Sequence, residues 1–289
     1  MVVVKYSSHF VALLATASIA LGQADPTSRS MNEPVSPFRI AGNLYYVGAK
    51  EVASFLITTP QGNILLDGGF AETAPQIERN MAQLGFKTED VKILLNSHAH
   101  FDHAGGLAEL KQKSGAKLIA GAADADLLRS GGRGDFRFGD TLPFPPVQPD
   151  QIIRDGESIQ LGEQVMTAHS TPGHTKGNTT WTTKILDSEK NYNVVFVGSQ
   201  SSLDYRFVGQ ESYPGIRADF EKSFARLKAL PCDIFLGSHG SFFNFLEKRK
   251  RLRSGESNAF VDPDGYKRYL MDSEKDFREK LAKQENKSE

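Results

Sequence analysis

Four potential metal ligands lie within six consecutive residues of this chain: His98, His100, Asp102 and His103. The apolar run 91–96 comes directly before them and is typical of a buried strand. Side chains on one face of an extended segment repeat every second residue, so His98 and His100 can face one metal ion together. The chain then turns into a glycine-rich helix start, which lets Asp102 and His103 reach a second position nearby. The fold must therefore bring a strand end and a helix start around one metal centre.

Two further histidines extend this pattern, because His174 and His239 each lie in a loop just after an apolar strand. Neutral imidazole and carboxylate are natural zinc ligands, and a catalytic zinc site keeps a fourth position open for water. We expect His174 to join the first two histidines of the cluster, and His239 to join Asp102 and His103. Two such sites, about 3.5–4 Å apart, form a dinuclear hydrolase centre. The alternative, histidines that only fill the core, is disfavoured by four ligands at this spacing.

Composition excludes several classes of function. The 289-residue chain has a formal net charge of -1, so no global field attracts nucleic acid or an anionic membrane. Its length allows one domain with a large core, and we expect a monomer that acts on a small molecule. The single cysteine, Cys232, excludes an internal disulfide. It precedes an apolar strand and lacks a C-x-x-C partner, so we interpret it as a small core residue rather than a nucleophile.

The N-terminal segment has the features of a secretory signal peptide. Lys5 precedes the apolar run 10–21, and the small residues that a signal peptidase reads end at Ala24. A membrane anchor is the alternative, but the run is shorter than the roughly 20 residues that a membrane span needs. We therefore expect residues 1–24 to be removed after export, which leaves a soluble periplasmic or secreted protein.

Strand-like and helical patterns alternate along the rest of the chain. After a loose lead-in at 25–37, the expected strands are 43–47, 54–58, 64–66, 91–96, 117–120, 151–153, 158–161, 164–169, 179–184, 193–197 and 233–236. The first expected helix contains Ile77 and Met81, and further helices are expected at 107–113, 124–129 and 219–230. A C-terminal helix is expected to have an apolar face of Tyr266, either Tyr269 or Leu270, Phe277 and Leu281. No repeat or linker divides the chain. The pattern predicts an α/β fold with two sheets packed face to face, helices on both outer sides, and one domain over 25–289.

Two segments allow two interpretations each. The stretch 130–150 is rich in glycine, proline and phenylalanine; it is either a wall of the active-site cleft or a surface loop held down by its own aromatic side chains. The basic run 248–253 either contacts nucleic acid or forms a solvated helix face, and the second interpretation is favoured.

These motifs together resemble the metallo-β-lactamase superfamily. The resemblance rests on the H-x-H-x-D-H cluster, the Thr-Pro-Gly-His turn that ends at His174, and the late His239 after a strand. It extends from about residue 43 to the C-terminal helix. It implies a four-layer αβ/βα sandwich that holds two zinc ions per chain in the groove between the sheet edges.

The third subclass of class B β-lactamases is the most similar group, through segments 65–69, 100–106, 170–175 and 258–263. Glyoxalase-like and lactonase-like relatives place a metal-bridging aspartate, and the first two lactamase subclasses a zinc-binding cysteine, where this chain has Ser199. In the third subclass His103 takes over as a ligand. The resemblance further implies that Ser199 and Ser201 contact the substrate carboxylate with Tyr205 nearby, and that Asp67 steadies a ligand imidazole.

The implied function is a zinc-dependent β-lactamase that opens the amide bond of penicillins, cephalosporins and carbapenems through a zinc-bound hydroxide, and thereby confers antibiotic resistance. Asp102 is the catalytic carboxylate that orients the hydroxide. The alternatives are a lactonase or thioesterase on the same centre, a metal-binding protein without catalysis, and a nuclease, which export and near-zero charge do not support. One departure is clear: relatives often join the Cys232 position to a second cysteine, and Tyr266 stands in its place.

Overall fold

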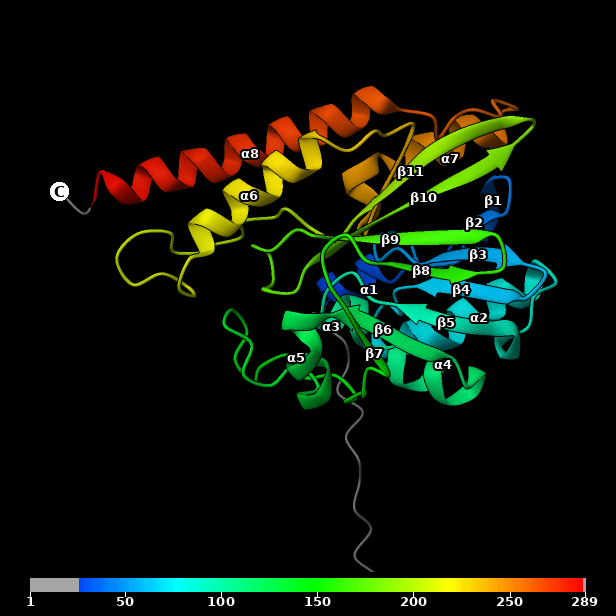
Figure 1. Ribbon diagram of the computed structural model, residues 1–289, viewed down its shortest axis with the longest axis horizontal. Coiled ribbons are helices and arrows are strands. Elements are labelled where there is room, and N and C mark those ends of the chain that lie inside the picture. The colour runs from blue at the N-terminus through cyan, green and yellow to red at the C-terminus, as the bar shows by residue number, and fades with distance from the viewer. Residues whose placement is uncertain (1–25, 288–289) are drawn as a thin grey trace, which may run out of the picture.

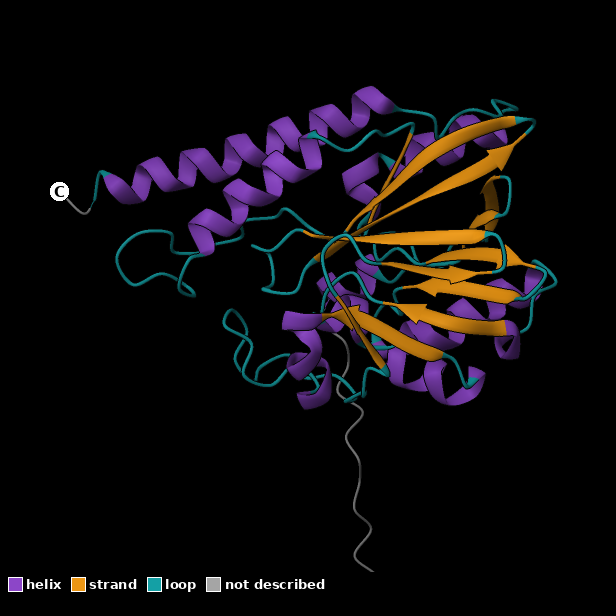
Figure 2. Ribbon diagram, viewed as in Figure 1, coloured by secondary structure: helices purple, strands orange, loops and turns teal. Residues whose placement is uncertain are grey.

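Two β-sheets pack face to face in the computed structural model, and helices cover their outer faces (Figure 1, Figure 2). The structure describes residues 26–287. The expected signal peptide, residues 1–24, lies outside the described residues. The arrangement confirms the predicted α/β sandwich of four layers.

The first sheet has the order β1-β2-β3-β4-β5-β6-β7. Its strands are β1 (Phe38–Ala41), β2 (Leu44–Tyr46), β3 (Phe55–Thr59), β4 (Gly62–Leu66), β5 (Val91–Leu95), β6 (Lys117–Gly121) and β7 (Gln151–Ile153). The first four strands pair antiparallel, whereas β5, β6 and β7 continue parallel to β4. Parallel strands end at the same edge of a sheet. Asp67, His98 and Asp124 follow β4, β5 and β6 and therefore gather at that edge.

The second sheet has the order β12-β11-β10-β9-β8. Its strands are β8 (Ser158–Leu161), β9 (Gln164–Ser170), β10 (Thr179–Asp187), β11 (Lys190–Val197) and β12 (Ile234–Gly237). Neighbours pair antiparallel except β11 and β12, which run parallel. The β9–β10 loop and the ends of β11 and β12 therefore meet at one edge. This edge carries His174, Ser199 and His239.

Eight α-helices complete the described chain: α1 (Pro26–Met31), α2 (Ala74–Gln83), α3 (Phe101–Ala104), α4 (Leu107–Ser114), α5 (Ala125–Ser130), α6 (Ile216–Lys228), α7 (Phe245–Arg253) and α8 (Pro263–Glu285). Helices α2 and α4 lie on the outer face of the first sheet, and α6, α7 and α8 lie on the side of the second (Figure 1). Gly115 ends α4 in a left-handed conformation at φ 69°; a residue with a Cβ is strained there. This turn ends α4 at the edge opposite the predicted ligands and leads the chain into the start of β6.

The main core lies between the two sheets. Ile57, Leu66 and Ile119 of the first sheet share one apolar cluster with Trp181 and Val195 of the second. A second cluster packs the outer face of the first sheet against α2, α4 and α5. The predicted apolar face of α8 is buried as expected, at Tyr266, Leu270, Phe277 and Leu281. These clusters hold the two loop-bearing edges in a fixed relation.

The structure differs from the sequence-based expectation in two places. The lead-in 25–37, which was expected to be loose, contains α1. The edge strand β1, which follows it and pairs with β2, was not predicted, because prolines 34 and 37 come directly before this short strand. Lys248 in the basic run is only 1% exposed, so the solvated-face interpretation is wrong for this residue. Its Nζ lies 3.1 Å from the Asp262 carboxylate, and this ion pair fixes α7 to the start of α8.

None of the helices within residues 26–287 combines the length and the apolar composition that a bilayer crossing requires.

Candidate metal centre

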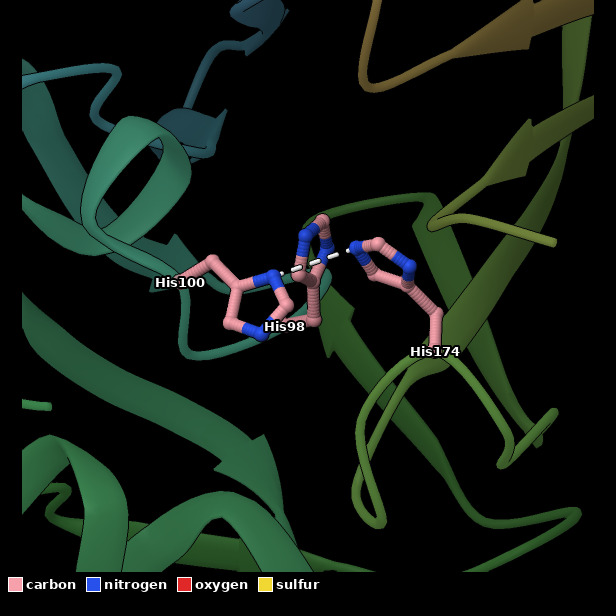
Figure 3. A group of neighbouring side chains, drawn as sticks. All are labelled: His98, His100 and His174. Atoms are coloured by element: carbon pink, nitrogen blue, oxygen red, sulfur yellow. Dashed lines mark hydrogen bonds between the residues drawn. The ribbon is translucent and has the colours of Figure 1, made fainter. Parts of the chain in front are cut away.

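Three histidines from two loops point toward one another where the loop-bearing edges of the two sheets meet (Figure 3). His98 and His100 lie between β5 and α3, and His174 lies between β9 and β10. All three are buried, and their ligand atoms lie within 4.8 Å of one another. His100 Nδ1 is 3.1 Å from His174 Nε2. Two ligands at opposite ends of a tetrahedral edge around zinc are separated by about 3.3 Å, so this spacing fits a metal ion.

The nitrogens that face away from the centre are held by neighbouring groups. Ser97 Oγ lies 3.0 Å from His98 Nδ1, and His174 Nδ1 donates to the Ser201 carbonyl at 2.8 Å. Because a neutral imidazole has one N–H and one lone pair, the second contact leaves the lone pair of His174 on Nε2, toward the centre. His98 Nε2 is buried and has no hydrogen-bond partner among the described residues. An unpartnered imidazole nitrogen aimed into such a group is the donor that a metal ion requires.

A second group adjoins the first and contains a carboxylate. Asp102 and His103 lie in α3, and His239 follows β12. His103 Nε2 and His239 Nε2 are 3.1 Å apart, and Asp102 Oδ2 lies 3.3 Å from the first of these and 3.6 Å from the second. The His98 and His103 rings are in contact at a centroid separation of 4.3 Å, so the two groups are neighbours. The six predicted ligands therefore lie in two adjacent groups, each of which could hold a metal ion.

The two groups differ in charge. Burial and the neighbouring histidines hold the pKa of His98 and that of His174 well below the ordinary value. Burial, reinforced by His103, lowers the pKa of His239 to about 3. Burial would also lower the pKa of His103, but the adjacent Asp102 outweighs it and raises that pKa. In turn, and against the effect of burial, His103 lowers the pKa of Asp102. The protein without metal therefore favours an ion pair between Asp102 and His103 in the second group.

Asp67 hydrogen-bonds the loop that carries His98 rather than a ligand imidazole. Its Oδ1 accepts the Ser97 N–H at 2.7 Å and the Asn96 side-chain amide at 3.1 Å. Burial raises the pKa of Asp67 to about 6, although nearby His103 opposes the change. Asp67 thus holds Ser97, and the Ser97 hydroxyl in turn contacts His98 Nδ1.

Asp124, which the sequence analysis missed, supports the candidate site. Its Oδ2 accepts the Ala99 N–H at 2.9 Å and the Thr175 hydroxyl at 2.7 Å, and its Oδ1 accepts the Gly177 N–H at 2.8 Å. This buried carboxylate therefore joins the loop of His98 and His100 to the loop of His174. The sequence could have indicated Asp124, because it follows the strand expected at 117–120. That strand is expected to run parallel to the strand before His98, so both residues would lie at the same edge of the sheet.

The predicted substrate contacts are not equally accessible. Ser199 is 0% exposed and accepts the Ser201 N–H at 3.2 Å. Tyr205 is 1% exposed and donates its hydroxyl to the His174 carbonyl at 2.8 Å, so it supports the His174 loop. Ser201 is the partly exposed member of the three.

The loop 131–149 contacts the centre, which favours the cleft-wall interpretation. The Phe138 ring meets the His100 ring at a centroid separation of 5.0 Å and the Phe101 ring at 5.8 Å. Asp135, which the sequence analysis did not single out, faces His100 at 3.7 Å. The tucked-loop interpretation applies to the other end of the loop, where Phe144 packs into the outer core of the first sheet.

Comparison with known proteins agrees with this geometry. A family model described as the metallo-beta-lactamase superfamily matches residues 47–239. The native FEZ-1 metallo-beta-lactamase of Legionella gormanii is 45% identical, with a TM-score of 0.86 over 88% of this chain and 98% of that chain. BJP-1 of Bradyrhizobium japonicum, a subclass B3 metallo-beta-lactamase, is 37% identical, with a TM-score of 0.83 over 90% of this chain and 98% of that chain.

A metallo-beta-lactamase of Cronobacter sakazakii with a HARLDQ motif is 41% identical, with a TM-score of 0.87 over 90% of this chain and 99% of that chain. The segment 98–103 of this chain reads HAHFDH, so histidine stands at the third and sixth positions of the same pattern.

Curated relatives are more distant. The hydroxyacylglutathione hydrolase of Methylobacterium nodulans is 25% identical over 139 residues, which is 45% of this chain and 46% of that protein. The chain thus spans about half the length of this curated relative.

Proposed function

This chain belongs to the metallo-beta-lactamase superfamily, and from that premise we propose that it is a zinc-dependent enzyme that hydrolyses the amide bond of β-lactam antibiotics. The observation that carries the proposal is the complete pair of ligand groups, with a histidine rather than a cysteine completing the second. Solved proteins that match nearly their whole length to this chain at 37–45% identity include a subclass B3 metallo-beta-lactamase and FEZ-1.

The ligand chemistry suits two zinc ions. Three neutral imidazoles would hold one ion, and Asp102, His103 and His239 would hold the other. Bound zinc supplies a water of lowered pKa and polarises a carbonyl oxygen. The buried edges around both groups keep bulk water from the ligand atoms, which strengthens their electrostatic interactions with a bound ion.

Asp102 is the catalytic carboxylate in this proposal. It lies between His103 and His239, and its lowered pKa keeps it ionised at neutral pH. An ionised carboxylate accepts a hydrogen bond from the attacking water and so orients that water toward the β-lactam carbonyl. The nearby Ser201 is the residue best exposed to donate a hydrogen bond to the substrate carboxylate, and Ser199 would act by holding the Ser201 backbone.

The competing function is a thioester hydrolase, which the curated relatives favour. The hydroxyacylglutathione hydrolase GloC of Haemophilus influenzae is 31% identical over 181 residues, and the chain covers 77% of it. Ser199 argues against this function, because thioesterase-like relatives place a metal-bridging aspartate there. Ser199 is buried behind Ser201 and carries no charge with which to bridge two ions.

A substrate comparison tests the proposal. Purified protein is supplied with zinc and given a penicillin, a cephalosporin, a carbapenem and a hydroxyacylglutathione thioester, each with and without chelator. We expect chelator-sensitive ring opening of at least one β-lactam, seen as an absorbance change, and slower thioester hydrolysis. Efficient thioester hydrolysis without β-lactam turnover would instead establish the competing function.

We also propose that residues 1–24 direct export, on the strength of their sequence alone. Export would place a monomeric enzyme where β-lactams enter the cell, and thereby support a role in antibiotic resistance. N-terminal sequencing of exported protein tests this proposal. A start at Asp25 is expected, and an exported chain that begins at Met1 contradicts it.

A further inference from the structure

One contact beside the metal centre is not used by the function proposed above. Asp135 Oδ2 and His100 Nε2 face one another at 3.7 Å, and their side chains are only 3% and 4% exposed. Neither atom has a hydrogen-bond partner among the described residues. Leaving a buried polar atom without a hydrogen bond costs free energy. Two such atoms that face one another therefore indicate a hydrogen bond between Asp135 and His100 in the functional state of the protein.

The chemistry of imidazole says which atom carries the hydrogen. His100 Nδ1 lies 3.1 Å from His174 Nε2, inside the first group, so Nδ1 is the atom with which His100 would bind a metal ion. A neutral imidazole has one lone pair and one N–H, so the hydrogen must then lie on Nε2. The acceptor that faces Nε2 is the Asp135 carboxylate. A carboxylate in this position fixes the tautomer and the ring orientation of a metal-binding histidine.

The other oxygen of Asp135 holds the loop. Oδ1 accepts the N–H groups of Arg137 at 2.8 Å and Phe138 at 2.7 Å. The Phe138 ring stands against His100, and Arg137 forms an ion pair with Asp204 at 2.6 Å. One buried carboxylate therefore connects the loop backbone to the ring of a metal-binding histidine.

We propose that Asp135 is a positioning residue that couples the loop 131–149 to the first metal group. Metal binding at His100 orders the loop through Asp135, and the loop in turn holds His100 in the orientation that binds metal. Because coupled binding free energies are reciprocal, a change that uncouples the two must weaken both effects. The inference rests on the metal site of the proposed function but not on its substrate.

Asp135→Asn is the test variant, because an amide has one oxygen and one NH2 group. It cannot accept the loop N–H groups and the His100 N–H with separate oxygens. Asp140→Asn is the matched control. It removes the same charge from the same loop, where the exposed carboxylate accepts the Gly134 N–H at 2.9 Å, a bond that the amide oxygen can keep.

Two measurements follow the coupling. In competition with a chromophoric chelator, we expect Asp135→Asn to weaken one zinc-binding step by about 10–100-fold and Asp140→Asn to leave both steps unchanged. In hydrogen exchange, zinc should slow the amides of residues 135–139 in the unmodified protein and in Asp140→Asn, but much less in Asp135→Asn. Unchanged zinc affinity, with faster loop exchange whether or not zinc is bound, would show that Asp135 only braces the loop and would overturn the proposal.

A measurement on the unmodified protein covers the case in which Asp135→Asn fails to fold. Nitrogen NMR of the zinc-loaded protein should show His100 with its hydrogen on Nε2; a hydrogen on Nδ1 would overturn the proposal. None of these measurements uses a β-lactam. Failure of the proposed substrate and failure of the coupling are therefore separate results.

Discussion

The two candidate metal-binding groups are neighbours, but different side chains surround their ligand atoms. The first has three imidazoles, whose outer nitrogens meet Ser97, Asp135 and the Ser201 carbonyl. The second has two imidazoles and the Asp102 carboxylate. Its outer carboxylate is Glu51, which lies 3.9 Å from His239 Nδ1 and also accepts the Ser241 N–H.

This difference determines what a metal ion must displace. The lowered pKa values of His98 and His174 leave these two imidazoles of the first group uncharged, so a metal ion binds without removing a proton from either. In the second group, Asp102 raises the pKa of His103, so a metal ion competes with a proton. The first group is therefore preorganised for metal, whereas the second combines binding with charge that can serve catalysis.

The largest effect is expected from Asp102→Asn. The variant should keep the first metal ion and weaken the second, and loss of the carboxylate should lower kcat for β-lactams by roughly 100–1,000-fold or more. Steady-state kinetics and metal analysis at saturating zinc check this. Asp126→Asn, which changes an exposed carboxylate paired with Arg129, is the control. Near-normal turnover in Asp102→Asn with both ions bound would contradict the assigned role of Asp102.

Asp124→Asn should affect the first group alone. The amide cannot accept all three of the hydrogen bonds from Ala99, Thr175 and Gly177, so the two loops that carry this group should loosen. We expect the affinity of the first zinc to fall about 10–100-fold while the second changes little. Chelator competition measures both steps. Equal weakening of the two would show that the groups are not supported independently.

Acidification should lower the zinc affinity of the second group before that of the first, the reverse of the effect of Asp124→Asn. A raised His103 pKa means that the proton is bound at a higher pH than usual, so affinity of the second group for zinc should fall as pH decreases through that pKa. The loss should approach about tenfold per pH unit below it. The first group, with its lowered pKa values, should keep its zinc to lower pH. Zinc titrations between pH 5.5 and 8 test this, and parallel losses at the two sites would contradict it.

The smallest effect is expected from Ser199→Ala. This change removes the acceptor of the Ser201 N–H but neither metal group. We expect KM for β-lactams to rise by roughly 2–10-fold, the worth of one hydrogen bond, while kcat and both zinc ions are retained. Kinetics together with metal analysis check the result. Loss of a zinc ion would show that Ser199 belongs to the second group.

Much of the fold, and the convergence of the six predicted ligands, could be predicted from the sequence because the relevant signals are local. Period-two and helical patterns located every strand of the two sheets except β1, together with α2, α4, α5 and α6, and the apolar face of α8 was identified from Tyr266 to Leu281. The ligand pattern rests on residue types that stand at strand ends. Short-range backbone geometry largely determines which way such side chains face.

Tertiary structure alone decided which polar groups surround those ligands. Asp124 meets Ala99 across 25 residues and Gly177 across 53, and Asp135 reaches His100 from a loop that has no regular pattern. The same packing buried Lys248, Ser199 and Tyr205, which the sequence suggested were exposed or open to substrate. Periodicity determines which face of an element is apolar. Which donor then meets which acceptor depends on how the two sheets close, because hydrogen-bond geometry and loss of solvent are set only there.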